Sequence, residues 1–216
     1  HREGRAVVDV TPMMVHLLAG GTRQIRWEFA PEWNTQPTRT FLSLRFSNQH
    51  KGYRPVRVTH LFDGGPFGPD YNMTREPVDV PIGADTVHTE LFAIISGHGG
   101  DYQNCAEFCD HHHYFTVNGH VMEKGYPMVG DDQGCLKQIE GGAVPNQWGT
   151  WWFGRGGWCP GMQVDPFTSD VTPFAAAGTT ARVSYEGYLG DDAPPETAGN
   201  IDLVSYLVEY APTTDR

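Results

Sequence analysis

The chain has 216 residues, a length that suits one domain or a large β domain. Its formal net charge of −11 argues against binding to nucleic-acid phosphates, which requires a surplus of lysine and arginine. The 26 glycines and 16 prolines argue against long helices, because both residues interrupt helix interiors. No apolar run approaches the roughly 20 residues of a membrane-spanning helix.

Short apolar runs, separated by clusters of Gly, Pro, Asn and Asp, follow one another along the chain. Asn118-Gly119 lies between two β-rich runs and predicts a hairpin, because both residues tolerate a positive φ. "PFAAAGTT" is too short for a helix, and we see no amphipathic one. Strands are expected within 38–48, 54–62, 86–97, 113–124, 181–190 and 200–212.

About eight to ten short strands predict an all-β fold: an antiparallel β-sandwich, in the form of an eight-stranded jelly roll with long loops and little helix. Residues 1–39 are expected to be an N-terminal extension that adds strands to a domain formed by residues 40–216. The segments 63–76 and 140–170 are rich in Gly, Pro and aromatic residues and exceed the usual length of a connection. They are candidate binding loops.

This loop-rich chain has four cysteines, an even number. The count favours two disulfides and an oxidising compartment, so we expect a secreted or periplasmic protein. The N-terminal "HREGRAVVDV" has no signal-peptide apolar region, so a leader has been removed or never existed. A structural zinc site is the alternative, but it usually shows two CxxC knuckles, which the sequence lacks.

The stretch "CAEFC" places Glu107 between Cys105 and Cys109. Five residues of a strand span roughly 13 Å, whereas a disulfide needs Cα atoms about 4.4–6.8 Å apart. If these cysteines pair, the segment must be a tight loop or helical turn that presents Glu107. The glycines of the preceding "GHGG" would allow a ligand to approach the backbone closely.

Downstream, "GTWWFGRGGWCPG" carries three tryptophans and Arg155. Aromatic faces combined with an arginine and a carboxylate are what a saccharide site needs, because tryptophan stacks on the C–H faces of pyranose rings. The tryptophans, Trp151 among them, are therefore candidate saccharide-binding residues, with Arg155 and Glu107 as their polar partners. The alternative for the tryptophans is a place in the core.

Three histidines follow the cysteine pair. If a strand begins at residue 111, His111 and His113 share one face of it and could bind copper or zinc through their imidazoles. A third ligand could be Met162, His98 or His120. No cofactor is the first expectation, and a mononuclear copper site is the alternative.

Taken together, "GHG", "NCAEFC", "FTVNG" and "RGGWCPG" resemble the C-terminal domain of the peptide-N-glycosidase F family over roughly residues 40–215. The resemblance implies two jelly rolls side by side, in a fold shared with copper-dependent peptidylglycine hydroxylases. It also implies hydrolysis of the amide between asparagine and the first N-acetylglucosamine of N-glycans. The disulfides it implies are Cys105–Cys109 and Cys135–Cys159.

Residue by residue, the resemblance makes Glu107 an active-site glutamate and places Arg155, Trp158 and His98 in the glycan cleft. Phe108 stands where the family has a tryptophan. The family's principal catalytic aspartate lies on the N-terminal jelly roll, and the first 40 residues here contain only Asp9. We therefore expect a glycoamidase-type hydrolase domain that needs a second jelly roll, as a domain or a chain. A non-catalytic glycan-binding module and a copper protein are the alternatives.

Overall fold

The structure is a computed structural model and describes residues 7–27, 39–47, 50–99, 102–145 and 149–213. Strands dominate these residues, and the helices among them are single turns. The strands are β1 (Tyr53–Pro66), β2 (Val78–Pro81), β3 (His88–His98), β4 (His111–Val117), β5 (His120–Lys124), β6 (Phe167–Asp170), β7 (Thr180–Leu189) and β8 (Asn200–Pro212). The helical turns are η1 (Thr11–Met14), α1 (Val15–Leu18), η2 (Tyr71–Thr74), η3 (Tyr102–Asn104), α2 (Cys105–Phe108) and η4 (Leu136–Gln138).

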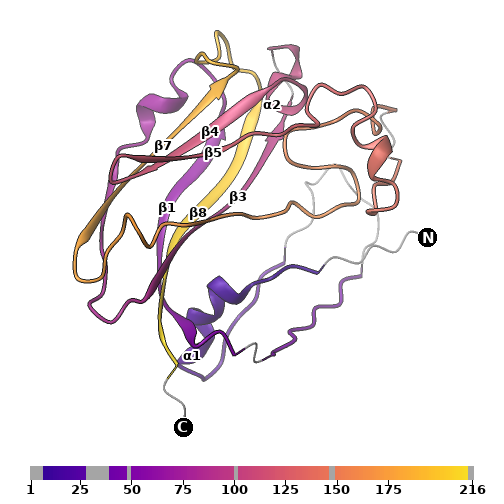
Figure 1. The fold of residues 1–216 in the computed structure, drawn as a ribbon. Helices are drawn as coiled ribbons and strands as arrows, with labels where there is room; N and C mark the ends of the chain where they lie inside the picture. The colour runs from indigo at the N-terminus through magenta and orange to yellow at the C-terminus, as the bar shows by residue number, and fades with distance from the viewer. Residues whose placement is uncertain (1–6, 28–38, 48–49, 100–101, 146–148, 214–216) are drawn as a thin grey trace.

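These strands form two four-stranded sheets, in the orders β1-β8-β3-β6 and β2-β7-β4-β5. Every neighbouring pair is antiparallel. The sheets pack face to face as a sandwich (Figure 1). The predicted all-β antiparallel sandwich with little helix is confirmed.

Alternation along the strands builds the core. In β4 the residues at odd positions, from His111 to Val117, are buried, while the intervening ones are half-buried. The predicted hairpin joins β4 to β5, and Asn118 and Gly119 both have a positive φ. The buried residues between the sheets include Leu91, Ala93, Ile95, Phe115, Val117, Val183, Tyr185, Ile201, Leu203 and Leu207.

The connection from β3 to β4 crosses from one sheet to the other. It contains η3 and α2, which lie over one end of the sandwich beside the long loop that follows β5 (Figure 1). Strand β3 delivers His98 to this end, and β4 starts there with His111. The residues singled out around "CAEFC" are therefore gathered at one end of the fold.

One predicted strand is wrong. Of the segment 38–48, the described residues 39–47 form no strand, and Phe41 and Phe46 are 84% and 69% exposed. Alternation of apolar and polar residues shows only that a segment suits a half-buried extended conformation; pairing also needs a partner edge. The structure also contains two short strands, β2 and β6, that the sequence analysis did not predict.

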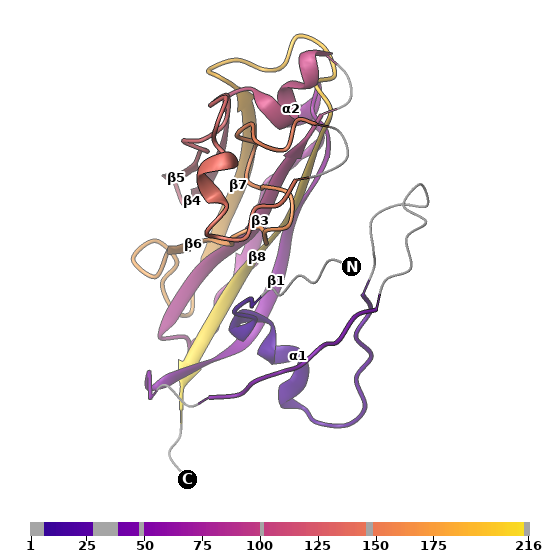
Figure 2. The same ribbon diagram turned by 90° about the vertical axis from the view of Figure 1, so that its right-hand side faces the viewer.

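The described part of the N-terminal extension, residues 7–27, holds η1 and α1 but no strand. It lies against the outer face of the β1-β8-β3 sheet (Figure 2), where Met13 packs against Phe92, Val208 and Tyr210. Across the described residues, no helix has the length and hydrophobicity needed to cross a membrane.

Candidate functional site

The small ring at the end of the sandwich is closed by the disulfide Cys105–Cys109, with the two Cα atoms 4.5 Å apart. The ring is the helical turn α2, and the Cys109 N–H donates to the Cys105 carbonyl at 3.1 Å. Gln103 and Asn104, just before it, both have a positive φ, so the chain turns sharply into α2. The tight turn expected for a paired "CAEFC" is confirmed.

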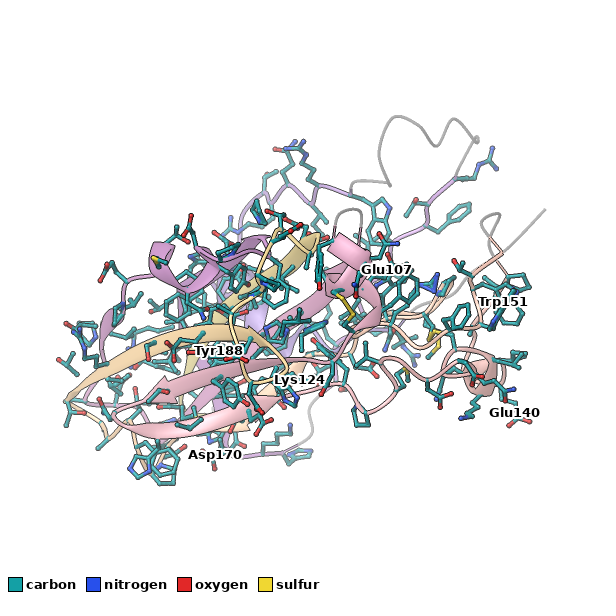
Figure 3. All side chains as sticks on the ribbon, turned by 90° about the horizontal axis from the view of Figure 1, so that it is seen from above. Glu107, Lys124, Glu140, Trp151, Asp170 and Tyr188 are labelled. Carbon is teal, nitrogen blue, oxygen red and sulfur yellow. A yellow bond between two sulfur atoms is a disulfide. The ribbon has the colours of Figure 1, made fainter. Side chains whose placement is uncertain are left out.

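Glu107 lies on this ring with its side chain 17% exposed (Figure 3). Its Oε1 accepts a hydrogen bond from Arg155 Nε at 2.8 Å, and its Oε2 accepts one from the Gly99 N–H at 3.1 Å. The Glu107 carbonyl accepts from the Gly156 N–H at 2.8 Å. Main chain and side chain are thus both fixed, and each carboxylate oxygen keeps a lone pair for a further donor.

Arg155 is the partner that fixes Glu107, and its side chain is only 2% exposed. Its Nη1 donates to the Thr150 carbonyl and its Nη2 to the Thr150 Oγ1, both at 3.1 Å. The guanidinium lies 4.9 Å from the ring centroid of Phe108 and 4.8 Å from that of Trp158. Burial lowers the pKa of Arg155 while Glu107 opposes that shift, so the guanidinium stays charged.

This burial changes the role that Arg155 can take. The sequence allows it to hold an amide or sugar oxygen of the substrate directly, but its guanidinium is covered by Phe108 and Trp158 and bonded to Glu107 and Thr150. We infer that Arg155 positions Glu107 and does not itself touch substrate.

Trp158 and His98 complete the cluster. Trp158 donates from Nε1 to the Gly97 carbonyl at 2.8 Å, and the His98 ring stacks on it with centroids 5.1 Å apart. His98 is also hydrogen-bonded to Ser96 at 2.9 Å and remains 38% exposed. The exposed edge of His98 makes it a candidate for ligand contact, whereas Trp158 already has His98 and Arg155 against its ring.

Trp151 lies outside this cluster, at the same end of the molecule (Figure 3). It packs edge-to-face on Trp152, and Trp152 in turn lies beside Phe153. Phe153 contacts Phe108 edge-to-face with centroids 6.3 Å apart. A line of aromatic side chains therefore connects Trp151 to the disulfide ring that carries Glu107.

Two glycines of the site serve packing within the protein. A Cβ on Gly97 would stand 1.7 Å from the Ala106 carbonyl oxygen, and one on Gly156 would stand 2.2 Å from His111 Nε2. The expectation that the glycines of "GHGG" allow a ligand to approach is wrong for Gly97, because the close neighbour there is the disulfide ring itself.

His111 and His113 share the inward face of β4, as predicted, and both are fully buried. His111 Nδ1 and His113 Nε2 are hydrogen-bonded at 2.9 Å, and His113 Nδ1 is bonded to the Tyr185 hydroxyl at 2.7 Å. Three of the four imidazole nitrogens therefore have partners within the protein. Of the three suggested third ligands, Met162 packs against the Cys135–Cys159 cluster, His98 stacks on Trp158 and His120 stacks on Phe174.

We expect the histidine pair to make the fold acid-sensitive. Burial lowers the pKa of His111 to about 4 and that of His113 well below its usual value. Because the unfolded chain takes up these protons near pH 6.5 and the folded chain does not, stability falls as pH drops below about 6.5. Between pH 6.5 and 5 the free energy of unfolding should fall by about 1.6 kcal/mol for each histidine that stays neutral in the folded chain.

Urea unfolding at several pH values between 6.5 and 5 measures this slope, and His111→Asn should make it shallower. A slope that is equally steep in the variant would contradict the assignment to His111.

The comparisons with known proteins agree with the sequence motifs. The family model described as "Peptide-N-glycosidase F, C terminal" matches residues 69–208, which is more than half of the chain. The chain belongs to this family. Among curated proteins, no match was found.

Solved structures share the fold. A peptide-N(4)-(N-acetyl-β-D-glucosaminyl) asparagine amidase has 20% identity and a TM-score of 0.54, over 74% of this chain and 53% of its own. A structure of PNGF-II has 15% identity and a TM-score of 0.53, over 75% of this chain and 31% of its own. The present chain thus spans about half of the amidase and about a third of PNGF-II.

The structure brings together the residues that the family resemblance singles out: Glu107, Arg155, Trp158, His98 and Phe108. Both implied disulfides are formed, Cys105–Cys109 and Cys135–Cys159. Sequence reasoning missed the hydrogen bonds that Gly99 makes to Glu107 and Thr150 makes to Arg155. Gly99 acts through its backbone N–H and leaves no signal in the sequence, whereas Thr150 stands five residues before Arg155 and was a detectable polar partner.

Proposed function

We propose that this chain supplies the Glu107 side of a glycoamidase active site, which acts on the amide between asparagine and N-acetylglucosamine in N-linked glycoproteins. The observation that carries the proposal is the fixed carboxylate: Glu107 is held on a disulfide ring, ion-paired with a buried arginine, in a member of the peptide-N-glycosidase F family. The structurally similar amidase bears this activity in its name.

Amide hydrolysis requires an activated water, a donor to the leaving nitrogen and stabilisation of the developing oxyanion. Glu107, with one free lone pair on each oxygen, would accept a hydrogen bond from the substrate or from the attacking water. Its Arg155 and Gly99 partners keep it from rotating away. We propose that a second jelly roll, as a domain or a partner chain, provides the aspartate that completes the site.

The proposed reaction uses no cofactor, and its partners are an N-glycan or glycopeptide and the second jelly roll. The two disulfides support a secreted or periplasmic location, since such bonds persist in oxidising compartments. Elemental analysis after copper loading tests the alternative that His111 and His113 hold a metal. Copper that binds the unaltered chain but not a His111→Ala/His113→Ala variant would support that alternative against the proposal.

Calorimetric titration of the chain with an N-glycopeptide tests the proposal. Glu107→Gln should weaken binding by about tenfold, because a hydrogen bond to a charged acceptor contributes about 1.5–3 kcal/mol. Glu186→Gln, an exposed change on β7, is the matched control and should leave the affinity unchanged. Equal affinities for the two variants would contradict the proposal.

A glycan-binding module without turnover is the second candidate. It is favoured by the commitment of Glu107 to two hydrogen bonds, which suits a carboxylate that orients a ligand. Mass spectrometry of the glycopeptide, in the presence of the second jelly roll, separates the two functions. Release of glycan that is lost in Glu107→Gln supports the amidase. Tight binding without any release supports the binding module.

A further inference from the structure

A hollow lined by aromatic side chains lies beside the Glu107 cluster, and the proposed reaction does not use it. Its volume is about 390 Å³, within the range of roughly 300–1,000 Å³ typical of ligand pockets. We call it the aromatic shelf, and it is lined by Asp132, Gln133, Leu136, Trp151, Trp152 and Phe153.

The aromatic shelf is open to solvent. Trp152 is 36% exposed and Leu136 is 38% exposed, and the two line the same hollow. The rings of Trp151 and Trp152 meet at 86°, so they form a corner with their centroids 6.1 Å apart. Apolar side chains gathered in an exposed hollow indicate a contact surface.

Hydrogen bonds and a disulfide hold the described backbone of the shelf. The N–H groups of Cys135 and Leu136 both donate to the Trp152 carbonyl, at 3.0 and 3.1 Å. The Gly154 N–H donates to the Asp131 carbonyl at 2.8 Å, and the disulfide Cys135–Cys159 ties the two ends of the loop together. A ligand would therefore bind the described residues of the shelf at little cost in ordering their backbone.

The shelf is continuous with the proposed reaction site. Phe153 lies at its inner end and contacts Phe108, which follows Glu107 in the disulfide ring. A chain molecule whose end reaches Glu107 could extend over Phe153 and onto Trp152. The ligand of the shelf is then a further part of the molecule that Glu107 holds.

The chemistry of the lining selects the class of ligand. Aromatic faces complement the C–H faces of sugar rings, and the exposed Asp132 and Gln133 at the rim can bond to hydroxyl groups. Asp132 repels anions, the chain carries a net charge of −11, and the neighbouring Lys137 is already paired with Asp131. Acidic sugars are thus disfavoured.

We propose that the aromatic shelf binds the outer, neutral sugar residues of the N-glycan and discriminates against sialylated ones. This rests on the proposed function for the identity of the glycan, but the shelf has its own residues and its own test. It makes Trp152 a specificity-determining residue for the length of the glycan and Asp132 one for its charge.

The test is calorimetric titration of the whole chain with a free neutral oligomannose glycan, which carries no asparagine amide. We expect saturable binding that Trp152→Ala weakens by about tenfold or more. Trp27→Ala, a change at another exposed tryptophan, is the matched control and should leave the affinity unchanged. A sialylated glycan should bind less tightly, and Asp132→Asn should narrow that difference.

Thermal unfolding of each variant shows whether it is folded. If Trp152→Ala is not folded, Asp132→Asn, a change at an exposed position, still tests the proposal. Absence of oligomannose binding, equal binding by the Trp152→Ala chain, or binding of an unglycosylated peptide in its place would overturn the proposal. Failure of the proposed function looks different: loss of Glu107-dependent glycopeptide binding while oligomannose still binds the shelf.

Discussion

Arg155→Met should lower the free energy of unfolding by about 3 kcal/mol, because it removes one partner of a buried ion pair. The substitution leaves the Glu107 carboxylate, 17% exposed, with only the Gly99 N–H as a partner. It also leaves both Thr150 acceptors without their guanidinium donors. Urea unfolding monitored by tryptophan fluorescence measures the change.

Arg182→Met is the matched control. Arg182 pairs with Asp79 on the surface, where the side chains are 62% and 58% exposed. Such pairs contribute about 0.5 kcal/mol or less once water and salt screen them. The double variant Glu107→Met/Arg155→Met should be less destabilised than Arg155→Met alone, because it leaves no buried charge unpaired. Equal losses in Arg155→Met and Arg182→Met would contradict the described role of Arg155.

The second large effect is expected for the Cys135–Cys159 disulfide. Its removal as Cys135→Ala/Cys159→Ala should cost about 3.5 kcal/mol, by the chain entropy of a loop closed over a sequence separation of 24. Removing Cys105–Cys109, which closes a loop with a separation of 4, should cost about 2 kcal/mol. Denaturant unfolding of both double variants under non-reducing conditions measures the two losses.

The affinity for an N-glycopeptide should change in the opposite order to the stability of the two disulfide variants. The large disulfide ties the loop of the aromatic shelf, whereas the small ring carries Glu107 itself. The small-ring variant should therefore lose more affinity for an N-glycopeptide while losing less stability. If the small-ring variant instead loses more stability than the large-ring variant, the small ring contributes mainly to stability, and the expectation that it serves to present Glu107 is wrong.

Local chemistry explains which parts of the fold are predictable. The Asn118-Gly119 hairpin and the alternation of β4 follow from two to seven adjacent residues, and both are found in the structure. The segment 38–48 has similar alternation, yet its described residues form no strand, since pairing depends on an edge that the sequence does not reveal. The strands β2 and β6, four residues each, are too short to show a period.

The site is predictable in its residue types and less so in its contacts. A disulfide ring that presents Glu107 follows from the spacing of Cys105 and Cys109 once they are taken as a pair, and the resemblance supplies the pairing. Neither the cysteine spacing nor the family resemblance shows that Arg155 is fully buried, because its burial depends on how Phe108 and Trp158 pack over the guanidinium. This burial is the reason why we infer that Arg155 positions Glu107 and does not hold the substrate.

We expect an N-glycopeptide to bind at Glu107, on the Cys105–Cys109 disulfide ring. The most direct measurement is a heteronuclear NMR titration of the labelled chain with an N-glycopeptide. We expect the backbone amide signals of Gly99, Glu107 and Gly156 to shift first and to saturate together, since these groups surround the carboxylate. Saturable shifts confined to other surfaces, with these three signals unmoved, would contradict it.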